Sequence, residues 1–369
     1  MGDRSAKGEQ LNKKQIALQR LQQQGLSQPS FRRPEDVVGW LGAVQAQDYA
    51  AAKWGVALRA QGLTDADLDQ AFDSGAILRT HVMRPTWHFV TPADIRWMQA
   101  LTAGRVNAAN AYYYRRLELD EAVFARSNAI LSSALQGGRY LTRGEIGEIL
   151  KQDGIDTLDR LRLTYLVLRS ELDALICSGP RRGKQFTYAL LEERAPQARV
   201  LDHDEALAEL IRRYFSGHGP ATVQDFAWWS GLTVAEAEAG LEMASPYLTQ
   251  TIVDEQTYWF ANSVSVVNQP SPSALLLPNY DEYLIGYTDR SAAFDVHDTK
   301  MENQRDNIVF NHTILINGRV AGTWKRIFTR GKVLLEARPF ASLSTAEEAA
   351  LARAVQRYGE FHGMPIMLR

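Results

Sequence analysis

Gln45, Gln47 and Asp48 are the residues of this chain whose types and spacing could do chemistry. Each glutamine amide offers one acceptor oxygen and two N–H donors, so a pair of them can orient a small molecule such as water. In an extended segment, side chains two residues apart project to the same side, whereas on a helix they diverge by about 200°. The alternative interpretation is that these residues cap a helix end and satisfy the loop backbone.

The elements around this cluster are expected to present it at the end of a buried segment. Pro34 suits a first helical position, and apolar residues from Val37 to Val44 recur at helical spacing. Thr64 and Asp67 form a capping-box start for another helix, which ends at Gly75. Residues 77–90 then have the β-branched and aromatic content of two short strands around a turn near Arg84 and Pro85. Short helices followed by a hairpin predict a winged helix.

The same outline recurs twice along the chain. Residues 141–150 and 161–175 are predicted as helices and residues 176–191 as two strands around a basic, glycine-rich turn. From Asp204, further helices lead to a strand pair at 248–260. The units are not close sequence repeats, and this outline is also common in unrelated small domains. The prediction of repeated winged helices therefore rests on the similar order of helices and strands alone.

The last third of the chain changes character after a loop with asparagine, serine and proline at 264–272. Residues 274–290, 308–328 and 332–340 are predicted as strands, with hairpin turns at Asn317-Gly318 and Arg330-Gly331. A helix opened by Ser344 should close a curled sheet or small barrel. The prediction is an α+β chain of tandem winged-helix units and a C-terminal β-barrel with a terminal helix. Its expected divisions are 11–130, 131–200, 201–264 and 265–369, with a disordered tail at 1–10.

The composition of the chain limits the functions that it can have. The 369 residues carry a formal net charge of −2, so any anionic partner must meet local basic patches. The single cysteine, Cys177, excludes an internal disulfide and a multi-cysteine metal site. The histidines lack zinc-binding spacing, and there is no P-loop or GxGxxG, so neither metal nor cofactor is expected. The polar N-terminus and the lack of a long apolar run predict a soluble, cytoplasmic protein.

Four separated segments carry a family resemblance: LGAVQAQDYAAAKWGVALRA, LRTHVMRPTWHFVTPADIRWM, PNYDEYLIGYTDR and NGRVAGTWKR. In this order they resemble the winged-helix DNA glycosylases of the AlkZ type. The resemblance implies a concave surface for duplex DNA and hydrolytic removal of alkylated purines, in some members including interstrand crosslinks. The family's Gln-x-Gln motif falls on Gln45 and Gln47, whereas a sister branch has aspartate at the second position. Asp48 comes one residue too late to stand for that aspartate.

The resemblance makes chemical sense of two neutral amides. A purine alkylated at N7 is already cationic and leaves as a neutral base, so the general acid that glycosidases use is unnecessary. The glutamines then need only hold a water against the anomeric carbon. Asp48 could add negative charge near the sugar cation, or simply cap a helix. We expect a monofunctional enzyme that uses no cofactor, needs no obligate protein partner and works near the nucleoid.

Contacts with the phosphate backbone should come from local basic clusters, with solvated turns as the alternative in each case. The predicted DNA-binding residues are Arg79, Arg84, Thr86, His88, Arg181, Arg182, Lys184, Lys325, Arg330 and Lys332. His88 could equally be a structural histidine against its aromatic neighbours. Family members are thought to probe DNA with a barrel hairpin, and both predicted turns qualify as its tip. The tryptophans at 87, 97, 228 and 229 are predicted to lie in the core.

Two rival functions remain open from the sequence. A winged-helix regulator would bind DNA without catalysis, although the candidate recognition helix around Phe226 is acidic and aromatic. A small-molecule hydrolase could use the charged cluster Asp281, Glu282, Asp289 and Arg290, whose members could also be internal ion pairs.

Overall fold

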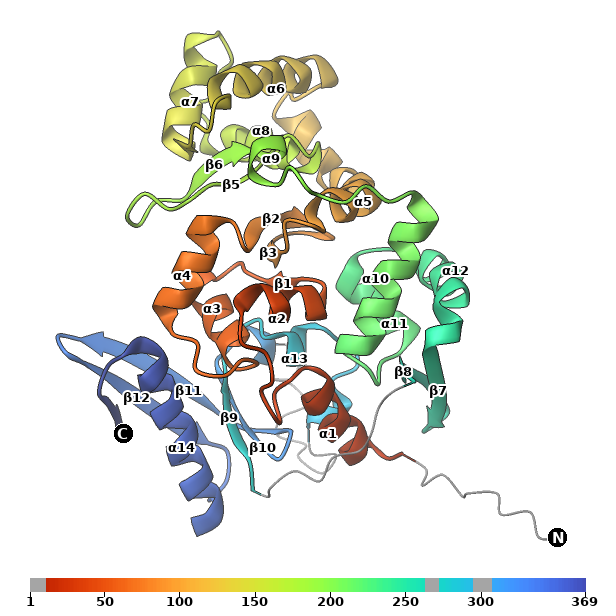
Figure 1. Ribbon diagram of the computed structural model, residues 1–369, viewed down its shortest axis with the longest axis vertical. Coiled ribbons are helices and arrows are strands. Elements are labelled where there is room, and N and C mark those ends of the chain that lie inside the picture. The colour runs from red at the N-terminus through yellow and green to blue at the C-terminus, as the bar shows by residue number, and fades with distance from the viewer. Residues whose placement is uncertain (1–10, 263–271, 295–306) are drawn as a thin grey trace.

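The computed structural model describes residues 11–262, 272–294 and 307–369 (Figure 1). The tail expected at 1–10 and the boundary expected at residues 264–265 lie outside these ranges. Within them, no helix is both long enough and apolar enough to cross a membrane.

The first unit surrounds the glutamine motif. Its elements are α1 (Lys13–Gln23), α2 (Pro34–Leu41), β1 (Val44–Gln45), α3 (Tyr49–Ala57), α4 (Asp65–Ser74), β2 (Leu78–Val82), β3 (Arg84–Val90) and α5 (Ile95–Arg116). The capping box of Thr64 and Asp67 and the left-handed Gly75 bound α4 as predicted. The hairpin turn lies at Met83, which has a φ of 64°, so Pro85 falls inside β3. β1, β3 and β2 form one antiparallel sheet in that order.

The second and third units repeat helices followed by a small sheet. The second contains α6 (Glu121–Leu135), β4 (Leu141–Thr142), α7 (Arg143–Gln152), α8 (Arg160–Leu172), β5 (Ile176–Ser178), β6 (Thr187–Leu190) and α9 (Leu191–Arg194). The third contains α10 (His203–Gly217), α11 (Val223–Ser230), α12 (Val234–Ala244), β7 (Leu248–Val253) and β8 (Gln256–Ala261). The second unit lies at the top of Figure 1, with its sheet next to β2 and β3 of the first unit.

The expected division at residue 130 lies inside α6. Phe124, Leu131 and Leu135 of this helix share a hydrophobic core with Ile146 and Leu150 of α7. Because a helix belongs with the core that buries its apolar face, we propose that the second unit begins ahead of α6.

The C-terminal part forms an open, curled sheet with a helix across it. Its elements are β9 (Ala274–Leu277), α13 (Glu282–Ile285), β10 (Thr313–Ile316), β11 (Arg319–Thr329), β12 (Lys332–Pro339), α14 (Thr345–His362) and β13 (Ile366–Leu368). The strand order is β13-β12-β11-β10-β9. Residues 278–290 do not continue the strand as predicted, because Pro278 follows the end of β9 and Asp281 caps α13 by accepting from the Tyr283 N–H.

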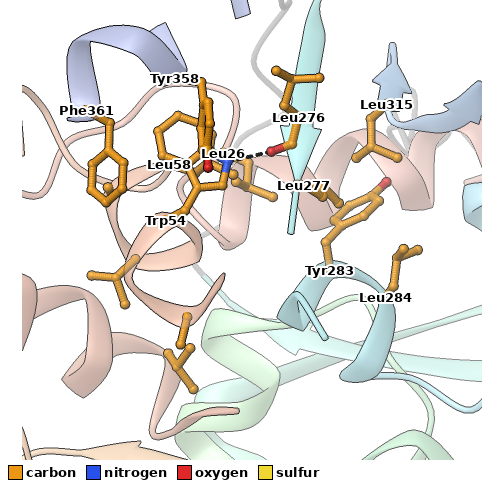
Figure 2. Close-up of a cluster of buried hydrophobic side chains, with 14 of the residues drawn as sticks. Leu26, Trp54, Leu58, Leu276, Leu277, Tyr283, Leu284, Leu315, Tyr358 and Phe361 are labelled. Carbon is orange, nitrogen blue, oxygen red and sulfur yellow. Dashed lines mark hydrogen bonds between the residues drawn. The ribbon is translucent and has the colours of Figure 1, made fainter. Parts of the chain in front are cut away.

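The first unit and the C-terminal sheet share one hydrophobic core. Trp54 of α3 packs edge-on against Tyr358 of α14, with ring centroids 5.0 Å apart, and contacts Phe361 (Figure 2). Its Nε1 donates to the carbonyl oxygen of Leu276 at 2.7 Å. Arg357 of α14 donates to backbone carbonyls at the end of α3. The helix that follows the glutamine motif is therefore held in place by residues of the C-terminal part of the chain.

Candidate active-site cleft

Gln45 lies on β1, which pairs with β3 so that Gln45 opposes His88. The hydrogen bonding between the two strands continues for one more bond, from the Ala46 N–H to the Trp87 carbonyl oxygen at 2.7 Å. The backbone N–H of Gln45 instead donates to Glu282 Oε1 at 2.7 Å. The first glutamine is thus held in extended conformation, whereas Gln47 lies in the bend that follows β1.

Gln47 lies where this pairing ends. Its Oε1 accepts a hydrogen bond from the Trp87 backbone N–H at 3.3 Å, in the place of the next ladder bond. Since that oxygen is engaged, the amide N–H groups are what Gln47 can offer to a bound molecule. The alternative that the motif satisfies loop backbone therefore applies to the side chain of Gln47.

Gln47 opens onto a cleft of about 730 Å³ between the first unit, the wing of the second unit and the segment before α13. The cleft is lined by Gln47, Asp48, Tyr49, Ala50, Arg79, Arg181, Lys184, Phe186, Asn279 and Tyr280. Gln45 lies below it, 7% exposed, and its Oε1 has no hydrogen-bond partner among the described residues. The two glutamines therefore differ in exposure: Gln47 lines the cleft, whereas Gln45 is buried and does not.

Asp48 serves as the N-cap of α3. One oxygen accepts from the Ala51 N–H at 3.0 Å, and the other lies 3.4 Å from Nδ2 of Asn279. The capping alternative is therefore correct for this residue. Its carboxylate nevertheless lines the cleft, so its negative charge also faces any molecule bound there.

Three predicted DNA-binding cations line the same cleft. Arg79 is held by the Ala46 carbonyl at 3.0 Å and lies over the Trp87 ring. Burial lowers the pKa of Arg79 to about 10, which leaves it charged at neutral pH. Arg181 bonds to Asp69 at 3.0 Å and lies over Tyr49. Lys184 is exposed at the tip of the wing.

The β3 residues predicted to contact DNA are largely internal. Arg84 is mostly covered and lies 5.9 Å from the Trp228 ring, and burial lowers its pKa. The hydroxyl of Thr86 is buried and has no partner among the described residues. His88 is 0% exposed and its Nδ1 lies 2.9 Å from the Thr86 carbonyl oxygen, so its burial favours the alternative of a structural histidine over the predicted contact with DNA.

The remaining predicted cations lie outside the cleft. Arg182 is paired with Glu145 at 2.6 Å. Lys325, Arg330 and Lys332 are exposed on the hairpin of β11 and β12.

The structure distinguishes the two candidate hairpin tips. A side chain at Gly318 would meet Leu21, Tyr283 and Ala17, so the Asn317-Gly318 turn is packed against α1. No atom lies within 4 Å of the position that a side chain would take at Gly331. Ile327 and Phe328, next to this second tip, are 47% and 50% exposed. Only the β11–β12 turn of the two is free to enter a groove.

Two members of the charged cluster considered for the rival hydrolase, Asp281 and Glu282, are buried and engaged in internal contacts. Asp281 forms a buried ion pair with Arg59 at 2.8 Å. Glu282 is buried with both oxygens engaged, by the Gln45 N–H and by Trp229 Nε1 at 2.9 Å. Burial opposes ionisation of Glu282, but the contact with His218, the Gln45 N–H and the charge of Arg84 outweigh it and lower its pKa to about 2. These carboxylates do not line the cleft.

The sequence analysis missed the aromatic walls of the cleft, which are Tyr49, Phe186 and Tyr280. Tyr280 adopts a φ of 59°, a strained conformation for a non-glycine residue that is concentrated at functional sites. The Pro278-Asn279 pair before Tyr280 was the sequence signal that could have indicated this turn. The prediction that Trp228 is a core residue was wrong, since it is 46% exposed, whereas Trp97 and Trp229 are buried.

Comparisons with known proteins agree on one family. A family model described as DNA glycosylase AlkZ-like matches residues 38–361. An interstrand DNA cross-link repair glycosylase of Streptomyces sahachiroi is 24% identical over 327 residues, which cover 85% of this chain and 87% of that protein. The solved structure of the Streptomyces sahachiroi DNA glycosylase AlkZ matches with a TM-score of 0.80 at 20% identity and covers 98% of this chain and 100% of the other. This likeness confirms the predicted fold class.

Proposed function

The chain belongs to the AlkZ-like family of DNA glycosylases, and from that premise we propose that it hydrolyses the N-glycosidic bond of N7-alkylated purines in duplex DNA. The observation that carries the proposal is the position of Gln47 and Asp48 at the rim of a cleft walled by cations and aromatic rings. Cations suit the phosphates of DNA and aromatic faces suit a base.

The proposed reaction needs no general acid. The bond between the anomeric carbon and N9 breaks, and its electron pair neutralises a base that N7 alkylation has already made cationic. Water then attacks the anomeric carbon of the sugar cation. Gln45 would accept from this water through Oε1, Gln47 would donate to the water or the sugar through its amide, and Asp48 would stabilise the positive sugar.

Duplex DNA is the proposed partner, and neither a cofactor nor an obligate protein partner enters the proposal. Arg79, Arg181 and Lys184 would bind phosphates beside the lesion. The hairpin with Lys325, Arg330 and Lys332 would bind the duplex at a second place. Arg182 would contribute only after release from Glu145.

Interstrand crosslinks through N7 are a second proposed substrate. The curated relative is named as a crosslink repair glycosylase. A base tied to both strands cannot be flipped fully into a deep pocket, and the open cleft around Gln47 does not demand flipping.

The test is excision of N7-methylguanine from a duplex, scored as alkali-labile abasic sites under single turnover. Gln45→Ala and Gln47→Ala should each slow excision about 10²-fold, within the range of lost positioning and hydrogen bonding. Gln152→Ala, at the exposed end of α7, is the control and should match the wild type. No excision by the wild type would refute the proposed substrate. Full activity in both glutamine variants would refute their roles and leave the reaction standing.

A duplex with a defined N7–N7 crosslink tests the second substrate. Unhooking would separate the strands on a denaturing gel, and persistence of the crosslink beside efficient N7-methylguanine excision would restrict the enzyme to monoadducts.

A further inference from the structure

Tyr280 lies in the cleft at a backbone position that suits a different residue type. It precedes Asp281, the N-cap of α13, and lines the cleft together with Gln47 and Asp48. Its φ of 59° is in the left-handed region, where glycine and asparagine are favoured and a bulky side chain is disfavoured. The tyrosine is therefore kept at a cost to the backbone, which points to a use for the ring itself.

The turn that carries Tyr280 is anchored on both sides. The backbone N–H of Tyr280 donates to the Val309 carbonyl oxygen at 2.8 Å. The N–H of the preceding residue, Asn279, donates to Nδ1 of His312 at 2.9 Å. The following residue, Asp281, forms a buried ion pair. The fold itself thus sets the position from which the ring of Tyr280 reaches the cleft.

The rings of the other two aromatic walls already have partners. Tyr49 packs edge-on against Phe186, with ring centroids 5.1 Å apart, and arginine side chains lie over both rings. Within the described ranges, the one aromatic ring beside Tyr280 is that of Phe310, at 5.7 Å and an interplanar angle of 88°, and no cation lies over Tyr280. In a perpendicular pair the edge of one ring meets the face of the other, so Phe310 covers at most one face of Tyr280. Tyr280 is therefore the wall residue that can offer a face to a bound base.

A negative charge lies beside the same turn. Asp48 is the one carboxylate among the described residues that line the cleft. It lies 3.4 Å from Nδ2 of Asn279, the residue before Tyr280. The three cations of the cleft come from the first unit and the wing of the second unit, whereas Asn279 and Tyr280 come from the segment before α13. An aromatic ring and a carboxylate together attract a cation.

We propose that Tyr280 is a specificity-determining residue, whose ring stacks on the N7-alkylated purine and selects it by its positive charge. This rests on the substrate class of the proposed function, although not on the proposed hydrolysis. Any base gains from stacking on an aromatic face, and a cationic purine gains further from the quadrupole of the ring. Once the glycosidic bond has broken, the base is neutral and loses the second attraction, which favours its release.

Three duplexes of one sequence separate the charge of the base from its shape. Their central nucleotide carries guanine, N7-methylguanine or 7-methyl-7-deazaguanine. The last of these has the methyl group and the shape of N7-methylguanine but no positive charge. In all three duplexes this nucleotide has a 2′-fluorinated sugar, because electron withdrawal by fluorine prevents loss of the base during a binding measurement.

The variants remove or keep the ring without disturbing the turn. Tyr280→Gly and Tyr280→Asn delete the ring, and both residue types suit a positive φ. Tyr280→Phe keeps the aromatic face and removes the hydroxyl. Tyr247→Ala, at a tyrosine of the third unit that is 61% exposed, is the matched control for loss of an exposed ring.

The measured quantity is the ratio of the duplex dissociation constants for the neutral and the cationic methylated base, from fluorescence anisotropy at one salt concentration. The wild-type protein should bind the cationic duplex about tenfold more tightly than the neutral one. Tyr280→Gly should reduce the ratio to about twofold, the remainder coming from Asp48. Tyr280→Phe and Tyr247→Ala should keep the wild-type ratio. A melting curve verifies that each variant is folded.

The possible outcomes are distinguishable. A wild-type ratio near one would overturn the inference, and so would an unchanged ratio in Tyr280→Gly, even if that variant bound all three duplexes more weakly. An equal fall of the ratio in Tyr247→Ala would also overturn it. If Tyr280→Gly does not fold, Tyr280→Asn decides by the same comparison.

Failure of the proposed reaction would look different, because none of the three duplexes is hydrolysed. A ratio that depends on Tyr280, without excision of ordinary N7-methylguanine by the wild type, would remove the proposed reaction and leave Tyr280 as a recognition residue. Excision by the wild type, with a ratio that does not depend on Tyr280, would do the reverse.

Discussion

The carboxylate of Glu282 accepts the backbone N–H of Gln45 at 2.7 Å across 237 positions of sequence. Its other oxygen accepts from Trp229 Nε1. One buried side chain from the C-terminal part therefore joins the strand of the glutamine motif to the third winged-helix unit.

Glu282→Gln should destabilise the protein by about 3 kcal/mol. Both carboxylate oxygens face donors, so an amide N–H₂ must oppose one of them. Chemical denaturation measures the loss. Glu348→Gln, on the exposed side of α14, is the control and should be neutral. A Glu282→Gln protein of wild-type stability would show that the contacts of Glu282 with Gln45 and Trp229 are not needed for folding.

Lys184→Ala should weaken duplex binding and reduce the slope of log affinity against log salt by about 1, without loss of stability. Arg181→Ala should do the same and also destabilise, because Arg181 bonds to Asp69 and packs over Tyr49. A salt titration by fluorescence anisotropy and a melting curve separate the two effects. Lys151→Ala, exposed at the end of α7, serves as the control. An unchanged slope in Lys184→Ala would exclude a phosphate contact.

Ile327→Ser on the free hairpin should weaken duplex binding about tenfold at unchanged melting temperature. An apolar side chain inserted between base pairs compensates for the cost of unstacking them, and serine would not. The side chain is 47% exposed, so little packing is lost. Val200→Ser, 78% exposed elsewhere, is the matched control. Equal affinity in both variants would argue that the hairpin does not enter DNA.

Stability should fall as the pH falls below about 6.5. Burial lowers the pKa of His88 to about 3 and, with the Arg326 charge, that of His312 to about 4. Between these values and 6.5 the unfolded chain binds protons that the folded chain does not, so each histidine removes up to about 1.4 kcal/mol per pH unit. Urea denaturation at pH 7.5, 6.5 and 5.5 checks the sign. Equal stability at the two extremes would contradict it.

Trp54→Phe should cost about 2 kcal/mol, because the indole donor to Leu276 and part of the contact with Tyr358 are lost from a buried site. Trp40→Phe is the control: it loses a similar bond, to the Gln23 carbonyl, from a position that is 38% exposed. The free energies of unfolding of the two variants should differ clearly, and equal values would count against the shared core.

The parts of the fold with local signals were predicted from the sequence. Capping boxes at Thr64 and Ser344 set helix starts, and Asn317-Gly318 and Arg330-Gly331 set hairpins. The helix α3 was not predicted, because residues 51–57 are all buried and so show no alternation of apolar and polar positions.

The candidate site was predictable where residue types and local motifs carry the signal. The motif and the cleft cations Arg79, Arg181 and Lys184 were among the predicted residues, and the free hairpin was one of two candidates. The bond between Glu282 and Gln45, the aromatic wall at Tyr280 and the exposure of Trp228 depend on how distant segments pack, which periodicity does not encode.

The core shared by Trp54, Tyr358 and Phe361 limits how early the first unit can fold during synthesis of the chain. A ribosome releases the glutamine motif early, yet partners that fix its segment follow much later in the chain, as the 300 positions between Ala57 and Arg357 show. The first unit must therefore remain incomplete until α14 has been made, and a chain cut short before α14 should not assemble the candidate site.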